Sequence, residues 1–68
     1  MNVYLLTIES QDGIAHYVYR FKEKALECVK STITGKKKQN EAIKALANLG
    51  HWEDNGEQYW LDEKELID

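Results

Sequence analysis

The sequence contains one cysteine, no proline and no long apolar run. Because Cys28 has no partner within the chain, a disulfide-stapled scaffold is excluded, and a lone thiol favours a reducing compartment. No segment approaches the ~18 consecutive apolar residues of a membrane span. The first residues also lack the basic segment of a secretory signal. We therefore expect a cytoplasmic protein that does not contact a membrane.

Its 68 residues suffice for one domain, residues 1–68, with a small core. The net charge of -3 is modest but unevenly distributed. Residues 1–52 carry eight basic and five acidic side chains, whereas residues 53–68 carry seven acidic side chains and only Lys64 as a base. Such asymmetry concerns partners and solubility rather than fold.

Two apolar segments around Asp12-Gly13 predict a first β-hairpin, with strands over residues 3–9 and 14–21. Asp-Gly is a strong signal for a two-residue type I′ turn. A loop of these two residues defines a register in which apolar side chains gather on one face with Ala15. The expected cross-strand pairs are Ile8 with Tyr17, Leu6 with Tyr19, and Tyr4 with Phe21.

Two helices are expected next. Residues 22–34 carry an apolar stripe at helical spacing, made of Ala25, Leu26, Val29 and Ile33. Gly35 is expected to end this helix, and residues 36–38 to form an exposed basic loop. Asn40 is the expected N-cap of the second helix, with Glu41 in its first turn, and Gly50 its end. The apolar side of this helix is Ala42, Ile43, Leu46, Ala47 and Leu49.

Asn55-Gly56 predicts a second hairpin, in which Trp52 faces Tyr59 and His51 faces Trp60. Residues 62–68 either extend its last strand or form a short helical turn, with Leu66 and Ile67 packed. The expected fold is α+β, in the order β-β-α-α-β-β. An antiparallel sheet forms one layer, and both helices cover one of its faces.

The sequence offers no arrangement of residues for catalysis, metal binding or a cofactor. Its two histidines and Cys28 are far apart, without the spacing of metal ligands. It has no glycine-rich phosphate loop and no nucleophile elbow. We therefore expect a protein that is not an enzyme.

Two binding functions remain. The first is a protein-binding module, because aromatic residues surrounded by acids are typical of interaction hot spots. Its expected site is Trp52, Glu53, Asp54, Glu57, Tyr59 and Trp60. The second is nucleic-acid binding through a lysine run and the helix and hairpin that follow it, using Lys36, Lys37, Lys38 and Lys44. Against it, the carboxylates at the hairpin tip would repel phosphates.

Several segments resemble small uncharacterised proteins of phage and bacterial genomes, which combine a hairpin, a helix and a returning acidic strand. The resemblance lies in residues 3–7, the Asp12-Gly13 turn, the helix with Lys24-Ala25 and Cys28, and residues 59–66. It covers most of the chain as a pattern, and the longer second helix departs from it. It implies a phage-type accessory protein or inhibitor that binds a host protein, and it assigns no functional residue.

Self-association is a further expectation. Val3, Leu5 and Val18 lie on the back of the first hairpin, with no further helix in the sequence to cover them. Either Leu66 and Ile67 fold over this patch, or a second copy covers it through a two-fold contact. The remaining interpretation is that these are scattered surface aliphatics without a role.

Overall fold

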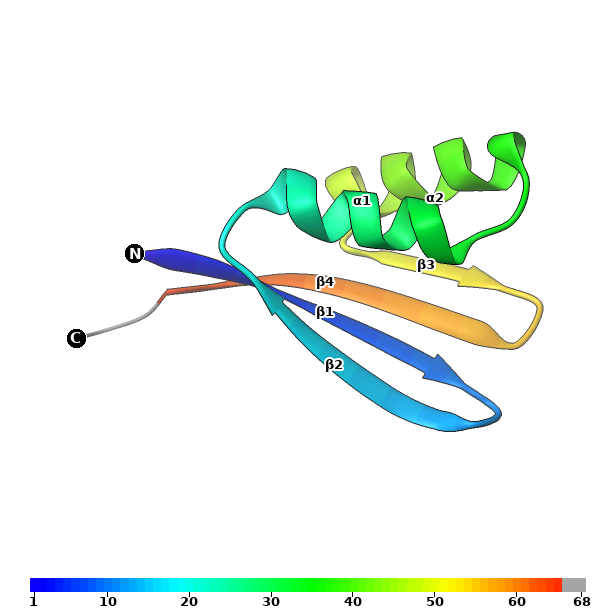
Figure 1. Cartoon of the computed structure of the whole chain (residues 1–68), viewed down its shortest axis with the longest axis horizontal. Coiled ribbons are helices and arrows are strands. Elements are labelled where there is room, and N and C mark those ends of the chain that lie inside the picture. The colour runs from blue at the N-terminus through cyan, green and yellow to red at the C-terminus, as the bar shows by residue number, and fades with distance from the viewer. Residues whose placement is uncertain (66–68) are drawn as a thin grey trace.

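The computed structural model describes residues 1–65 and contains six regular elements. Two layers are visible in Figure 1, a four-stranded antiparallel sheet and a pair of helices on one of its faces. The α+β fold and the β-β-α-α-β-β order expected from the sequence are confirmed. The elements are β1 (Asn2–Ser10), β2 (Gly13–Tyr19), α1 (Lys22–Thr32), α2 (Lys36–Leu49), β3 (His51–Asp54) and β4 (Glu57–Glu65).

The strand order in the sheet is β2-β1-β4-β3, so the two hairpins lie side by side. The first and last strands of the chain, β1 and β4, form the centre of the sheet and pair antiparallel from Asn2–Glu65 to Glu9–Gln58. The strands β2 and β3 are the edges (Figure 1).

The register of the first hairpin differs from the expected one by two residues. The observed pairs are Tyr4–Tyr19, Leu6–Tyr17 and Ile8–Ala15. The turn is Gln11-Asp12, closed by the pair Ser10–Gly13, and the Asp12 N–H donates a 3.3 Å hydrogen bond to Ser10 Oγ. This hydrogen bond to the serine side chain stabilises a turn in which Asp12 does not adopt a positive φ. Because moving a turn by one residue shifts every pair by two, the side chains stay on the expected faces.

Phe21 is the exception on that face. It lies beyond the end of β2, in the N-cap position of α1, and its side chain is exposed. Its carbonyl accepts the first helical hydrogen bonds, from the N–H groups of Lys24 and Ala25. The expected pairing of Phe21 with Tyr4 is therefore wrong, because the chain must leave the sheet at this point to enter the helix.

The boundary between the helices also differs from the expectation. α1 ends at Thr32, and Gly35, expected to end it, instead occupies the N-cap position of α2. α2 then begins at Lys36, so the lysine run forms its first turn rather than a loop, and Asn40 lies inside the helix. Gln39 provides the local reason, since its side chain donates a 2.7 Å hydrogen bond to the carbonyl of Ile33. Lysine is also a good helix former.

The second hairpin has the expected register, with Trp52 opposite Tyr59 and His51 opposite Trp60. Its turn has positive φ angles at both central residues, Asn55 and Gly56, as a type I′ turn requires. The expected end of the second helix is also confirmed, because Gly50 adopts the left-handed conformation after α2.

The core lies between the helices and the two central strands. Figure 1 shows both helices above the same face of the sheet. The buried side chains come from β1, α1, α2 and β4 and from the connection between the helices, and they are Leu6, Ala25, Val29, Ile33, Ala42, Leu46, Tyr59 and Leu61. Leu26, which the helical stripe included, is only half-buried at the margin of this cluster.

Within residues 1–65, neither helix is long and apolar enough to cross a membrane. The expected packing of Leu66 and Ile67 concerns residues outside the described range.

Candidate interaction surfaces

Within the described residues, the helices leave one face of the sheet uncovered (Figure 1). Alternate residues of a strand point to opposite faces, and directly paired residues share a face. Since Leu6, Tyr59 and Leu61 point into the core, their strand neighbours point outward. We call this outward side the open face. It consists of Val3, Leu5, Thr7, Glu9, Ile14, His16, Val18, His51, Glu53, Gln58, Trp60, Asp62 and Lys64.

The middle of the open face is apolar and aromatic. Leu5 lies between Val18 and Asp62 in one cross-strand row, and Trp60 lies between Thr7 and His51 in the next. The rings of His51 and Trp60 are in contact, with centroids 5.4 Å apart and planes tilted by 32°. Thr7 Oγ1 shares a 3.0 Å hydrogen bond with His16 Nδ1, which continues this second row to the sheet edge. Together these rows form a surface with an apolar centre.

Carboxylates surround that centre. Glu9, Glu53 and Asp62 lie on the open face itself, and all three are paired with neutral residues across the sheet. Lys64 is the basic residue among the open-face positions in the strands, at the end near the chain termini. The surface is therefore apolar in the middle and mainly negative at its border.

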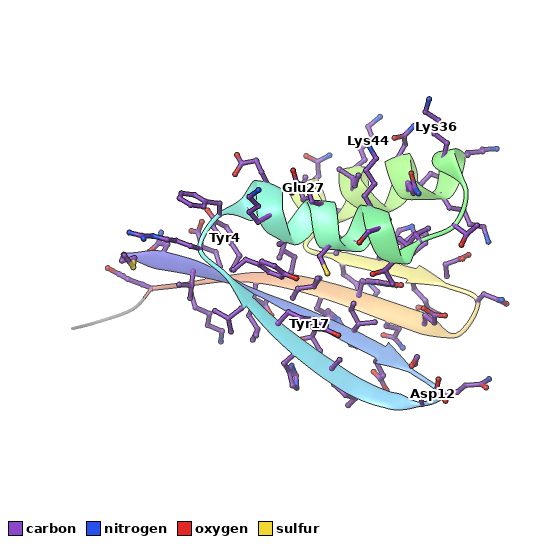
Figure 2. All side chains as sticks on the ribbon, in the orientation of Figure 1. Tyr4, Asp12, Tyr17, Glu27, Lys36 and Lys44 are labelled. Carbon is purple, nitrogen blue, oxygen red and sulfur yellow. The ribbon has the colours of Figure 1, made fainter. Side chains whose placement is uncertain are left out.

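The fold sorts charge between the two layers. The helices and their connection, residues 22–49, carry seven lysines and three glutamates. The sheet and its two turns, residues 2–19 and 51–65, carry eight acids and the single base Lys64. Figure 2 shows Lys36 and Lys44 on the side of the helical layer away from the sheet, and Asp12 at the tip of the first hairpin. The molecule thus has a basic helical layer and an acidic sheet layer.

The residues expected to form a protein-binding site do not form one patch. Trp60 and Glu53 lie on the open face, whereas Trp52, Asp54, Glu57 and Tyr59 lie on the opposite side of the same hairpin. Tyr59 is only 2% exposed and belongs to the core, and Trp52 packs against it with ring centroids 5.5 Å apart. Tyr59 is therefore unavailable to a partner. The sequence showed that Tyr59 and Trp60 must face opposite ways, but not which one faces the helices.

The hydroxyl of Tyr59 donates a 3.1 Å hydrogen bond to Glu57 Oε2. Burial, followed by this bond to the carboxylate, raises the pKa of Tyr59 from 10.0 to about 12. The pKa of Tyr19 is also raised to about 12, first by its hydrogen bond with Cys28 and then by burial. Both phenols thus stay neutral in the folded protein at a pH where they ionise in the unfolded chain.

These shifts predict a loss of stability in strong base. A raised folded-state pKa contributes stability that is fully present below pH 10.0 and is lost as the pH rises through about 12. The urea midpoint should therefore fall over that interval, and Tyr59→Phe should make the fall shallower without abolishing it, because Tyr19 remains. When the titration is followed by phenolate absorbance, Tyr59→Phe should lack part of the absorbance change that occurs near pH 12. An identical late signal in the variant would contradict the assignment of this pKa to Tyr59.

The lysines expected to bind nucleic acid are exposed at the start of α2, with Lys44 farther along the helix. Lys38 differs from the others because its Nζ lies 3.1 Å from Asp54 Oδ2 of the second hairpin. The pair is solvent-exposed and contributes at most about 1 kcal/mol. It nevertheless places a carboxylate next to the lysine run, which weakens the positive potential there.

Cys28 and the histidines lie apart in the fold. Cys28 is half-buried in α1, next to Tyr19, whereas His16 and His51 lie on the open face, in strands at opposite edges of the sheet. Across the described part of the chain, no three His, Cys, Asp or Glu side chains gather in a way that would hold a metal ion.

Val3, Leu5 and Val18, the residues of the expected dimer contact, all lie on the open face. Leu5 and Val18 are direct cross-strand neighbours, and Val3 follows two positions from Leu5 along β1. The patch is therefore continuous, and a face-to-face contact between two copies stays a prediction.

Comparison with known protein families, with curated proteins and with solved structures finds no match to this chain.

Proposed function

We propose that this protein is a non-enzymatic binding module and that it contacts a partner protein through the open face. The observation that carries the proposal is the arrangement of Leu5 and Trp60 in the two central strands, with Val18 beside Leu5, on a sheet surface bordered by carboxylates. A desolvated apolar and aromatic centre within a polar border is the usual anatomy of a protein interface.

The partner would present a basic surface with an apolar centre. Glu9, Glu53 and Asp62 lie on the same face as the apolar residues, so that contact would bring opposite charges together around it. Such complementarity raises the association rate and disfavours acidic partners. On the strength of the resemblance to small phage and bacterial proteins, we extend the proposal to an accessory role in which the partner is a host protein.

Charge reversal tests the proposal with a matched control. Glu53→Lys/Asp62→Lys alters the open face, whereas Glu27→Lys/Glu41→Lys makes the same change in net charge on the exposed helical layer. Affinity capture from lysate, followed by titration of the captured protein, should show binding lost in the first variant and retained in the second. Loss of about tenfold or more in affinity is expected, since like charges replace complementary ones at the contact.

Equal binding by both charge-reversed variants would contradict the use of the open face. Circular dichroism of both variants provides the folding control, because all four positions are exposed.

Nucleic-acid binding is the second candidate, and the net positive charge of the helical layer favours it. The relevant side chains are those of Lys36, Lys37 and Lys44, which project from α2. An electrophoretic shift assay at low salt separates the two functions. Tight, steeply salt-dependent binding that Lys36→Glu/Lys37→Glu abolishes would support this candidate and contradict the first.

A further inference from the structure

The two edges of the sheet differ in how they are protected against pairing with another strand. The edge strand β3 has four residues and carries Glu53 and Asp54, and short length and charge both discourage pairing. The other edge strand, β2, has seven residues, Gly-Ile-Ala-His-Tyr-Val-Tyr, with no proline, lysine, arginine or carboxylate. By the usual criteria β2 is an unprotected edge.

β2 is also open to solvent. In the strand order it has β1 on one side and no described element on the other (Figure 1). In an antiparallel ladder, every second residue directs its N–H and C=O away from the paired strand, so β2 presents unpaired backbone groups at its outer side. Its apolar side chains are exposed as well, with Ile14 at 61% and Val18 at 68%. Within the described chain, this edge therefore presents outward backbone groups without a paired strand and two largely exposed aliphatic side chains.

We propose that two copies of this chain pair through β2, antiparallel and about a two-fold axis at His16, to form a continuous eight-stranded sheet. His16 is the central residue of β2, so this register aligns the strand with itself over its full length. Ile14 of one copy then lies opposite Val18 of the other, and Ala15 lies opposite Tyr17. These two kinds of pair join apolar residues, whereas the centre pairs two histidines and the ends pair Gly13 with Tyr19.

A groove beside β2 supports this register. On the helix side of the sheet, a cavity of about 360 Å³ is lined in part by Ala15, Tyr17, Cys28 and Thr32. In the proposed dimer, Tyr17 of the second copy lies opposite Ala15, the smallest side chain along this side of the groove. Its ring enters the space next to α1, and the two-fold axis repeats the contact. The small residue and the large one complement each other across the edge.

The sequence of β2 favours a second copy of the same chain as the strand that pairs with this edge. The strand has no side chain of fixed charge to select a basic or acidic peptide, whereas its apolar pattern is complementary to itself. This contact differs from the face-to-face one through Val3 and Leu5, because it uses the strand edge and leaves the two open faces uncovered and side by side. It does not depend on the proposed function.

Cysteine cross-linking tests the edge and its register together. In a Cys28→Ser background, His16→Cys places two thiols directly opposite each other, within reach of a disulfide. Val18→Cys is the control on the same strand and the same face. Its two copies would lie four residues apart along the strand, roughly 13 Å, too far to bond. Under mild oxidation we expect rapid covalent dimers for His16→Cys and slow ones for Val18→Cys.

A second test introduces charged residues at the proposed contact and measures the molecular mass by sedimentation equilibrium. The unaltered chain, kept reduced, should show a mass that rises above 7.9 kDa with concentration. Ile14→Lys and Val18→Glu should each weaken the dimer about tenfold or more, because each places a charge opposite an apolar residue twice per dimer. The double variant should recover the dimer, because the new lysine then faces the new glutamate of the other copy.

A mass of 7.9 kDa at every concentration would overturn the proposal. So would faster cross-linking at position 18 than at position 16, or a double variant that dissociates as readily as the single ones. Dissociation by Leu5→Lys combined with insensitivity to Ile14→Lys would assign the dimer to the open face instead.

Discussion

Replacing Leu6 by alanine should lower the free energy of unfolding by about 2–5 kcal/mol. Leu6 is 0% exposed, in a central strand between Tyr17 of β2 and Leu61 of β4. Truncation removes apolar contacts and leaves a cavity that a paired strand cannot move to fill. Because the core of a chain shorter than about 70–80 residues rarely supplies more than about 3–5 kcal/mol, the variant should be unfolded or close to it at ambient temperature.

Urea denaturation followed by tryptophan fluorescence measures this change. Leu49→Ala provides the control, because Leu49 is 81% exposed at the end of α2. It should change the free energy of unfolding by less than about 0.5 kcal/mol, as for most surface substitutions. Equal losses in the two variants would show that Leu6 does not have the central place in the core that the strand register assigns to it.

The second large effect is expected at Gly50, which ends α2 with a φ of 75°. Alanine there should cost about 1–2 kcal/mol for the left-handed backbone alone. A further cost comes from crowding, since an added Cβ would lie 3.1 Å from the carbonyl oxygen of Leu61. The carbonyl of Gly50 also accepts a 2.9 Å hydrogen bond from the Leu61 N–H, so the backbone cannot move away without weakening that contact.

Gly56→Ala separates the two contributions. Gly56 also has a positive φ, of 86°, but an added Cβ would meet no atom within 4 Å. We expect Gly56→Ala to show only the backbone cost, and Gly50→Ala to exceed it in the same urea experiment. A smaller loss at Gly50 than at Gly56 would contradict the crowding against β4.

Local sequence signals predicted much of this fold because each acts within a few residues. Asn55-Gly56 specified the second hairpin and its register, and Gly50 marked the end of α2. The alternating pattern in the first hairpin placed Leu6 and Tyr17 on the same face even though the turn was assigned one residue too late. That error arose because the Ser10 side chain stabilises a turn at Gln11-Asp12, a competitor of the Asp-Gly turn.

The candidate surface was harder to predict, because it depends on pairing between distant segments. Nothing near Leu5 or Trp60 in the sequence indicates that β1 and β4 are neighbours, and only this pairing brings the two residues onto one face. The choice between Tyr59 and Trp60 as the buried residue depends on the same long-range contact. The sequence showed an acidic C-terminal segment, whereas the fold distributes that charge across a whole layer of the molecule.

The basic helices and the acidic sheet make the protein an electric dipole directed from the sheet layer to the helical layer (Figure 1). A dipole experiences a torque in the field of a charged body, so the molecule turns before it touches anything. It would approach a polyanion with its helices leading and a polycation with its sheet leading, although its net charge of -3 is the same in both encounters. The separation of charge between the two layers thus governs how the molecule is oriented as it approaches a charged partner, rather than how strongly it is attracted overall.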